Sequence, residues 1–147
     1  MPDAGPPPRV DFYILGEGSA TSPALLACKL GERAWRAGYR VLIVCADAEG
    51  CGQLDQLLWT FRDEAFVPHA QAPAHDPLDP IVIGTDEAGL AAEFGFRIRL
   101  DPQAPCTPPT GRIAEIVAGD PGARDRGRER FRWYRQHGIE PGSHRID

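Results

Sequence analysis

The sequence predicts an α/β fold, a three-layer α/β/α sandwich around a mostly parallel sheet of about five strands, of the Rossmann-like kind. Three observations support this class. Short apolar runs alternate along the chain with longer amphipathic segments that begin at helix-capping residues. Residues 41–46 are apolar without interruption, which is typical of a strand covered on both faces. The 147 residues are enough for one domain with a substantial core.

The first half of the chain predicts a strand, a helix, a strand and a helix. Residues 10–15 form a short apolar run that stops at a Gly-Glu-Gly sequence, as a strand would. Ser22 is suited to cap a helix that has Pro23 at its first position and runs to about Ala37. The apolar run described above is the second strand, and a helix over about 49–62 follows it. Strand, helix and strand in this order indicate a right-handed βαβ unit.

The middle of the chain is less regular. Residues 71–80 hold three prolines and no periodicity, so they predict a loop. Residues 81–84 predict a short strand, and residues 86–93 fit either a helical turn or a loop. Apolar residues alternate with arginines over 96–100, which predicts a strand with one face in solvent.

A strand and a long helix are predicted near the C-terminus. After the proline-rich residues 101–111, the last strand covers 113–118. Asp120 followed by Pro121 is typical of an N-cap and a first helical position, and Gly138 is a suitable end. The predicted organisation is therefore a flexible leader over 1–8, a single α/β domain over 9–142 and a tail over 143–147.

Composition excludes several functional classes. The net charge of −5 means that the chain as a whole should repel a phosphate backbone. The four cysteines have no Cys-x-x-Cys spacing, so buried thiols in a reducing cytosol are expected in place of a metal site. No run reaches the ~18 apolar residues that span a bilayer, and the N-terminus lacks an apolar signal core. We therefore expect a cytoplasmic protein without a membrane partner.

The second predicted helix carries a tryptophan away from its apolar face. At about 100° per residue, Trp59 lies about 140° from the centre of the core-facing stripe. Phe66 follows close by in a Phe-Val-Pro-His sequence. An exposed indole beside another aromatic ring suggests a surface that binds another protein. The alternative is that a neighbouring loop covers Trp59.

The closing helix is rich in arginine. Helical spacing brings Arg124, Arg128, Phe131 and Arg135 within about 60° of one another. Such a stripe suits a short acidic peptide that ends in an apolar side chain, because guanidinium groups bind carboxylates while the ring packs against the apolar group. Two alternatives remain open. The arginines could be solvated and paired with acidic residues of the same helix, or they could bind nucleic acid directly.

Enzymatic interpretations are weaker. The Gly-Glu-Gly sequence and Asp47 resemble parts of a nucleotide-binding enzyme, but Thr21 occupies the place of the third glycine of the dinucleotide fingerprint. His69 has Asp63 and Glu64 nearby, although a structural contact is a better role for it than a general base. No serine lies in a nucleophile elbow, and no set of carboxylates is suited to two metal ions.

Several segments resemble the chi subunit of bacterial DNA polymerase III. They are Leu-Asp-Gln-Leu-Leu-Trp-Thr-Phe-Arg-Asp-Glu-Ala-Phe-Val-Pro-His at 54–69, Val-Asp-Phe-Tyr at 10–13, Ala-Trp-Arg-Ala-Gly-Tyr-Arg-Val-Leu-Ile at 34–43 and Arg-Glu-Arg-Phe-Arg-Trp-Tyr-Arg at 128–135. The similarity covers roughly residues 9–142 and is weakest between about 70 and 112. It implies an α/β sandwich and a non-catalytic role in the clamp-loader complex, without a cofactor.

The resemblance also implies two binding surfaces. The first binds the acidic C-terminal tail of single-stranded DNA-binding protein, which ends in phenylalanine, through Val117, Arg124, Arg128 and Phe131. The second docks psi, the subunit that links chi to the clamp loader, through Trp59, Phe66, Val67 and Pro68. The resemblance also implies that a helicase-like protein competes for a similar surface. It implies that nucleic acid is contacted mainly indirectly. The alternative to this adaptor function, from another functional class, is a nucleotide-binding Rossmann-like enzyme.

The predicted helix departs from the commoner family pattern at two positions. Arg124 replaces a lysine and keeps the charge, whereas Phe131 replaces a tyrosine and loses a hydroxyl group. Two glycines, Gly122 and Gly127, should also weaken this helix by roughly 1 kcal/mol each where they lie in its interior. We therefore expect the start of the helix to be frayed until a peptide binds.

Overall fold

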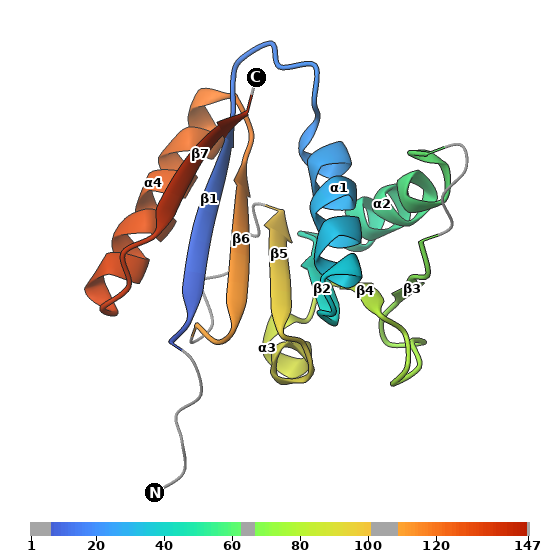
Figure 1. The fold of residues 1–147 in the computed structure, drawn as a ribbon. Coiled ribbons are helices and arrows are strands. Elements are labelled where there is room, and N and C mark those ends of the chain that lie inside the picture. The colour runs from blue at the N-terminus through green and yellow to red at the C-terminus, as the bar shows by residue number, and fades with distance from the viewer. Residues whose placement is uncertain (1–6, 63–66, 101–108, 147) are drawn as a thin grey trace, which may run out of the picture.

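The structure, a computed structural model, describes residues 7–62, 67–100 and 109–146. In these residues the chain forms one sheet of seven strands, in the order β3-β4-β2-β5-β6-β1-β7, flanked by helices (Figure 1). The strands are β1 (Arg9–Leu15), β2 (Val41–Val44), β3 (Ala70–Gln71), β4 (Ile81–Gly84), β5 (Phe96–Leu100), β6 (Arg112–Val117) and β7 (Gly142–Ile146). The helices are α1 (Pro23–Arg36), α2 (Ala48–Thr60), α3 (Glu87–Leu90) and α4 (Pro121–Gln136), with a 3₁₀ turn at Ala91–Glu93.

The predicted fold class is confirmed. The six strand pairings are all parallel, and the strands alternate with helices along the chain. The five predicted strands and the three long helices are present, and the segment 86–93 is helical. Ser22 and Asp120 accept hydrogen bonds from Leu25 N and Ala123 N, so both predicted N-caps are in place.

The sheet is larger than predicted, because each edge carries one strand more. The two-residue β3 lies beside β4, and β7 pairs in parallel with β1 from Asp11↔Gly142 to Leu15↔Ile146. The expectation that residues 143–147 form a tail is therefore wrong for residues 143–146, which belong to the edge of the sheet. The sequence Gly-Ser-His-Arg-Ile has no apolar run, so its pairing could be recognised only from the fold.

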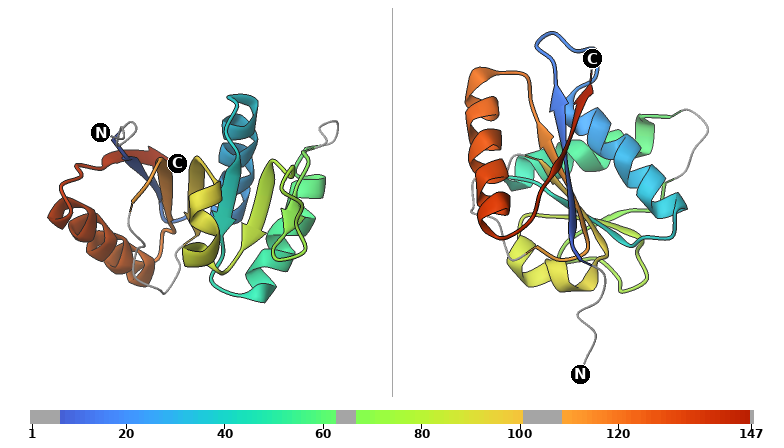
Figure 2. Two further views of the ribbon diagram at one scale, coloured as in Figure 1. Left: turned by 90° about the horizontal axis from the view of Figure 1, so that it is seen from below. Right: turned by 60° about the vertical axis from the view of Figure 1, so that its left-hand side comes forward.

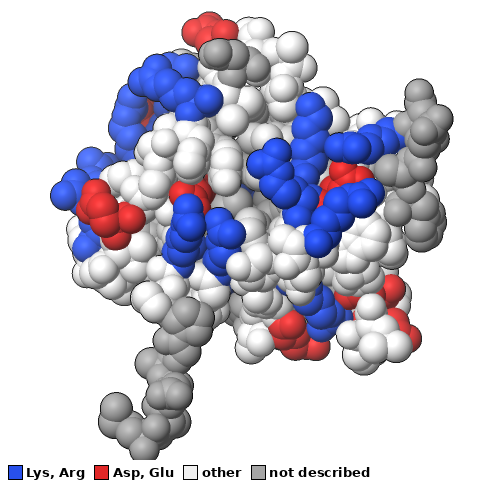
Figure 3. Space-filling view, viewed as in Figure 1, with Lys and Arg blue, Asp and Glu red and all other residues white. Residues whose placement is uncertain are grey.

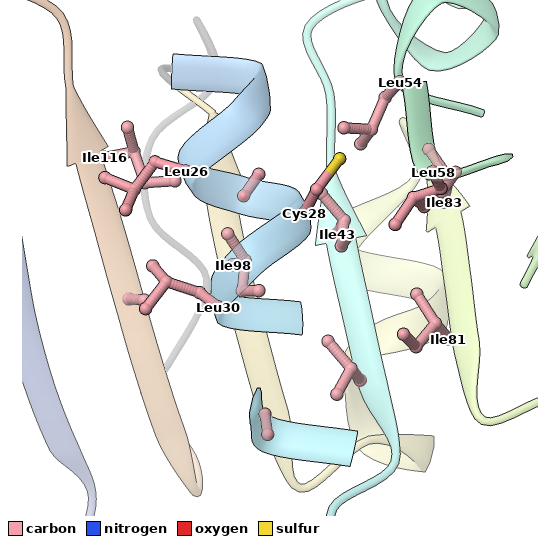
Figure 4. Close-up of a cluster of buried hydrophobic side chains, with 14 of the residues drawn as sticks. Leu26, Cys28, Leu30, Ile43, Leu54, Leu58, Ile81, Ile83, Ile98 and Ile116 are labelled. Atoms are coloured by element: carbon pink, nitrogen blue, oxygen red, sulfur yellow. The ribbon is translucent and has the colours of Figure 1, made fainter. Parts of the chain in front are cut away.

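One face of the sheet is covered by α1 and α2. In Figure 4, Leu26 of α1 lies beside Ile116, Ile98 lies between Leu26 and Leu30, and Cys28 lies beside Ile43. Alternate residues of the central strands and the inner face of α2 complete this cluster. Each fully buried Leu or Ile side chain stabilises the fold by about 1.5–3 kcal/mol relative to an exposed one.

The opposite face is covered by α3 and α4, so the molecule has three layers (Figure 2). Here the expectation of a solvated face on β5 is wrong, since Arg97 and Arg99 are 1% and 0% exposed. Glu87 of α3 pairs with both guanidinium groups at 2.9 Å. Glu115 of β6 is also fully buried and pairs with Arg99. Buried arginines are tolerated at these positions because carboxylates from two other elements neutralise them.

Candidate functional site

The helix α4 is fastened to the sheet by a polar and an aromatic contact. Arg130 Nε donates to Glu115 Oε1 at 2.9 Å, and the Tyr134 hydroxyl donates to Glu115 Oε2 at 2.6 Å. The ring of Phe12 on β1 lies 5.2 Å from that of Phe131, centroid to centroid. Glu115 and Phe12 thus fix the rotation of α4 about its axis. Arg130 is directed toward Glu115. Arg124 and Arg128, which the sequence places on the opposite face of the helix, are therefore directed elsewhere.

A glycine allows α4 to lie close to β6. A Cβ atom at Gly127 would approach two methyl carbons of Val117 at 3.0 and 3.1 Å. The helix α4 is continuous from Pro121, and the expectation that glycines leave its start frayed until a peptide binds stays a prediction. Gly127 has a packing role, since its missing side chain makes room for Val117.

Between α4 and the sheet lies a groove of about 290 Å³. Its floor consists of one row of residues across three strands, because Ile14 of β1 pairs with Val117 of β6 on one side and with Arg145 of β7 on the other. Paired residues of neighbouring strands point to the same face of a sheet. The lining residues are Phe12, Ile14, Val117, Arg124, Gly127, Arg128, Phe131 and Arg145.

All four residues predicted for the first surface line this groove. Val117 contributes to its buried floor, and the half-buried ring of Phe131 stands beside Phe12. Arg124 and Arg128 add guanidinium groups on the helix side. Arg135, which helical spacing placed on the same stripe, does not line the groove and pairs with Glu140 at 3.3 Å.

The two arginines of α4 differ in how they are satisfied. Arg128 Nη1 donates to Asp125 Oδ1 at 2.8 Å, and both side chains are largely exposed, so this pair is weak. The Nε atom of Arg124 is buried, and no hydrogen-bond acceptor for it lies among the described residues. A buried donor without an acceptor costs about 1–3 kcal/mol. A ligand oxygen that enters the groove could recover this free energy.

Sequence reasoning missed Phe12, Ile14 and Arg145. The alternation of Phe12 and Ile14 along the first strand marks them as one face, but it does not reveal which helix covers that face. Arg145 lies in residues 143–147, for which the sequence predicts only a tail. Figure 3 shows cationic side chains gathered over α4 and the adjoining edge of the sheet, and another group over α1.

The second predicted surface is partly as expected. Trp59 is 48% exposed, and one side of its ring packs against His69 at 4.4 Å between centroids. Pro68 is half-buried. Val67, however, is 1% exposed and packs in the main core, so the prediction that it contacts a partner is corrected: its side chain supports the surface from below. Phe66 lies outside the described residues.

His69 has a structural role in this surface. Its side chain is fully buried, and its ring nitrogens lie 2.7 Å from the carbonyl oxygen of Val67 and 3.2 Å from that of Asp55. These contacts tie the loop after α2 to the helix itself and hold the ring against Trp59. The carboxylates considered as its catalytic neighbours, Asp63 and Glu64, lie outside the described residues.

The geometry does not fit a dinucleotide site. In that site the glycine-rich loop and the acidic ribose ligand follow adjacent strands. Here Gly16–Gly18 follows β1 and Asp47 follows β2, and the strand order places β5 and β6 between them. Three strand spacings correspond to about 14 Å. Asp47 Oδ1 moreover accepts a hydrogen bond from Gly50 N at 2.7 Å as the N-cap of α2.

The cysteines are inert in the described structure. Cys28, Cys45 and Cys51 are buried and free, and Cys106 lies outside the described residues. Burial raises the pKa of the Cys28 thiol to about 12, and it also raises the pKa values of Cys45 and Cys51. These thiols therefore stay protonated at neutral pH and are poor nucleophiles and metal ligands.

The described residues contain neither a cluster suited to a metal ion nor a membrane-spanning helix. No three His, Cys, Asp or Glu side chains within 7–62, 67–100 and 109–146 lie close enough together to hold a metal ion. Over the same ranges, every helix is too short or too polar to cross a lipid bilayer.

Fold and site together define a class: a small, single-sheet α/β protein with a cationic groove suited to a carboxylate-bearing ligand. Residues 8–142 match the family model described as DNA polymerase III chi subunit, HolC. The chain therefore belongs to the chi-subunit family of DNA polymerase III.

Relatives in three bacteria agree with this assignment. DNA polymerase III subunit chi of Pseudomonas aeruginosa is 37% identical over 139 residues, which cover 94% of this chain and 96% of that protein. The Escherichia coli subunit is 37% identical over 62 residues, 40% of this chain and 42% of that protein. The Haemophilus influenzae subunit is 38% identical over 58 residues, 40% of each.

Proposed function

We propose that this chain is a non-catalytic adaptor subunit of the replicative polymerase in the bacterial cytoplasm. Its arginine-lined groove binds the acidic C-terminal tail of single-stranded DNA-binding protein. Its Trp59 surface docks the psi subunit, which links it to the clamp loader. The chain thereby connects protein-coated single strands with the clamp-loader complex, and it transforms no substrate itself.

The observation that carries the proposal is the combination of groups in the groove. An apolar floor lies beside guanidinium groups that have spare hydrogen-bonding capacity, above all the buried Nε of Arg124. A phenylalanine at the end of a peptide would pack against Ile14 and Phe131, while preceding aspartates would bind Arg124 and Arg128. A ligand carboxylate also competes easily with Asp125, whose exposed pair with Arg128 contributes little stability.

The lost hydroxyl at position 131 does not harm this arrangement. The Phe131 ring packs against Phe12, and this contact needs no polar group. Replacing a lysine by Arg124 adds a planar group that can bind a carboxylate through two N–H groups. The groove therefore keeps both kinds of contact that the proposed ligand requires.

The test is a titration of Arg128→Ala with a fluorescently labelled peptide that ends in Asp-Asp-Ile-Pro-Phe. We expect about a ten-fold loss of affinity, because one charge-assisted contact of about 1.4 kcal/mol is removed. Arg132→Ala is the matched control, since Arg132 is an exposed arginine of α4 outside the groove. Unchanged affinity of Arg128→Ala, or an equal loss in both variants, would refute the assigned groove.

A further inference from the structure

The edge strand β7 gives the groove a second cationic side. Arg145 pairs with Ile14 in the parallel register, so both side chains lie on the α4 face of the sheet. The preceding residue, His144, belongs to the other face, where it bonds Asp11 at 3.0 Å and stacks on Tyr13 at 4.9 Å. The alternation along β7 thus fixes Arg145 toward the groove, and the contacts of His144 hold the strand in this register.

Arg145 faces the helix arginines across an apolar floor. Val117, Ile14 and Arg145 form one row, in which neighbouring strands are about 4.8 Å apart, so Arg145 begins about 10 Å from Val117. Arg124 and Arg128 rise from α4 on the other side. A ligand in the groove therefore meets guanidinium groups on both sides.

The charge of Arg145 has no competitor in the described part of the chain. It is exposed, and no carboxylate of residues 7–62, 67–100 and 109–146 forms an ion pair with it. Arg135, by contrast, is paired with Glu140 and lies outside the groove. Among those residues, Arg145 therefore has no ion pair that a ligand carboxylate must first break.

We propose that Arg145 is a specificity-determining residue of this groove, which binds a carboxylate of the acidic peptide from the β7 side. The proposal rests on the proposed function, because it assumes that the groove binds such a peptide. It adds that the groove selects peptides with carboxylates directed to both walls. A peptide that is acidic on the helix side alone binds more weakly.

The experiment compares Arg145→Ala with Arg135→Ala in the full-length chain, using the labelled peptide that ends in Asp-Asp-Ile-Pro-Phe. Both variants remove one exposed arginine, so the change in net charge is the same. We expect Arg145→Ala to weaken binding about three- to ten-fold and Arg135→Ala to leave it unchanged. Peptides with asparagine in place of each aspartate in turn, and one with an amidated C-terminus, identify the carboxylate, since the effect of Arg145→Ala should vanish against one of them.

The outcomes separate this inference from the proposed function. If Arg128→Ala weakens binding but Arg145→Ala does not, the role of Arg145 is refuted and the groove assignment stands. If neither variant weakens binding, both are refuted. Equal losses in Arg145→Ala and Arg135→Ala would show an effect of net charge alone and refute the inference. So would an Arg145→Ala effect that persists against every asparagine peptide and against the amidated peptide.

Discussion

Gly127 occupies a close approach between α4 and the sheet. A side chain at this position would meet the methyl groups of Val117, which is 3% exposed. Valine is β-branched and has few rotamers, so it cannot easily turn aside. The distance between α4 and the groove floor is therefore set by a missing side chain. Val117 and Gly127 form one structural unit beneath the arginines.

This contact predicts opposite effects for two glycines of α4. Gly127→Ala should destabilise the fold by about 1–3 kcal/mol, because the overlap with Val117 outweighs the gain of about 1 kcal/mol in helix propensity. Gly122→Ala is the matched control. A Cβ there meets only the ends of the Arg126 and Asp120 side chains, at 3.3 and 3.4 Å, so stability should be unchanged or higher. The measurement is urea denaturation.

Peptide binding provides a second measurement for the same pair. Gly127→Ala should also weaken binding of the acidic peptide, because a helix that moves away from Val117 carries Arg124 and Arg128 with it. Gly122→Ala should bind as the parent chain does. A Gly127→Ala variant as stable as Gly122→Ala would show that Val117 yields without cost and would contradict this account.

The groove residues that periodicity revealed are those on one helix, and Val117 of β6 was expected only from the family resemblance. The 3.6-residue period alone places Arg124, Arg128 and Phe131 on one stripe. The period could not show that Arg130, on another side, anchors the helix to Glu115, nor that Arg135 lies past the end of the groove. Both facts depend on the lengths and positions of strands that are remote in sequence.

At the scale of elements, β5 shows where pattern reasoning failed. Arginines that alternate with apolar residues ordinarily mark a solvated face. In β5 they face α3 and α4, and their charges are compensated by Glu87 and Glu115. Neither carboxylate is close enough in sequence to reveal the pairing. The apolar central strands were predictable, because a continuous apolar run needs no partner to be recognised.

The edge strand β7 is the second element that the sequence concealed, and its removal is a direct test. Deletion of residues 142–147 should lower the free energy of unfolding by about 2–4 kcal/mol, because several ladder hydrogen bonds to β1 are each worth about 1 kcal/mol. The measurement is urea denaturation, with a chain lacking only Asp147 as the control. If the long deletion were as stable as the control, residues 143–146 would be a dispensable tail after all.

At the scale of the whole molecule, the two proposed surfaces lie far apart. The groove lies where α4 covers β1, β6 and β7, whereas α2, which carries Trp59, packs beside β3 and β4 near the other edge (Figure 1). The strands between them are held by a continuous core and by the buried ion pairs. Such a rigid sheet should allow both partners to bind at once.

The separation predicts independent effects of mutations. Trp59→Ala should weaken psi binding by roughly 30-fold or more, since a tryptophan at the centre of an interface often contributes 2 kcal/mol or more. It should leave peptide binding unchanged, and Arg128→Ala should do the reverse. Calorimetric titration of each variant with psi and with the peptide measures both effects.

The chain contains a matched control for the indole. Leu78 is the other large apolar side chain that is exposed in the described residues, at 89%. Leu78→Ala removes exposed apolar surface from the segment between β3 and β4, outside the residues assigned to either surface, and should change neither affinity. If Trp59→Ala and Arg128→Ala each abolished both interactions, the two-surface arrangement would be wrong.

The place of β1 in the sheet has a consequence for how the protein is made. The strand leaves the ribosome well before its two neighbours, β6 and β7, because Arg9 pairs with Arg112 and Asp11 with Gly142. Until β6 and β7 are synthesised, the apolar residues of β1 have no neighbouring strands to join, and contacts so distant in sequence form slowly. We therefore expect the nascent chain to expose Phe12 and Leu15 until β6 and β7 emerge, and to bind chaperones up to that point.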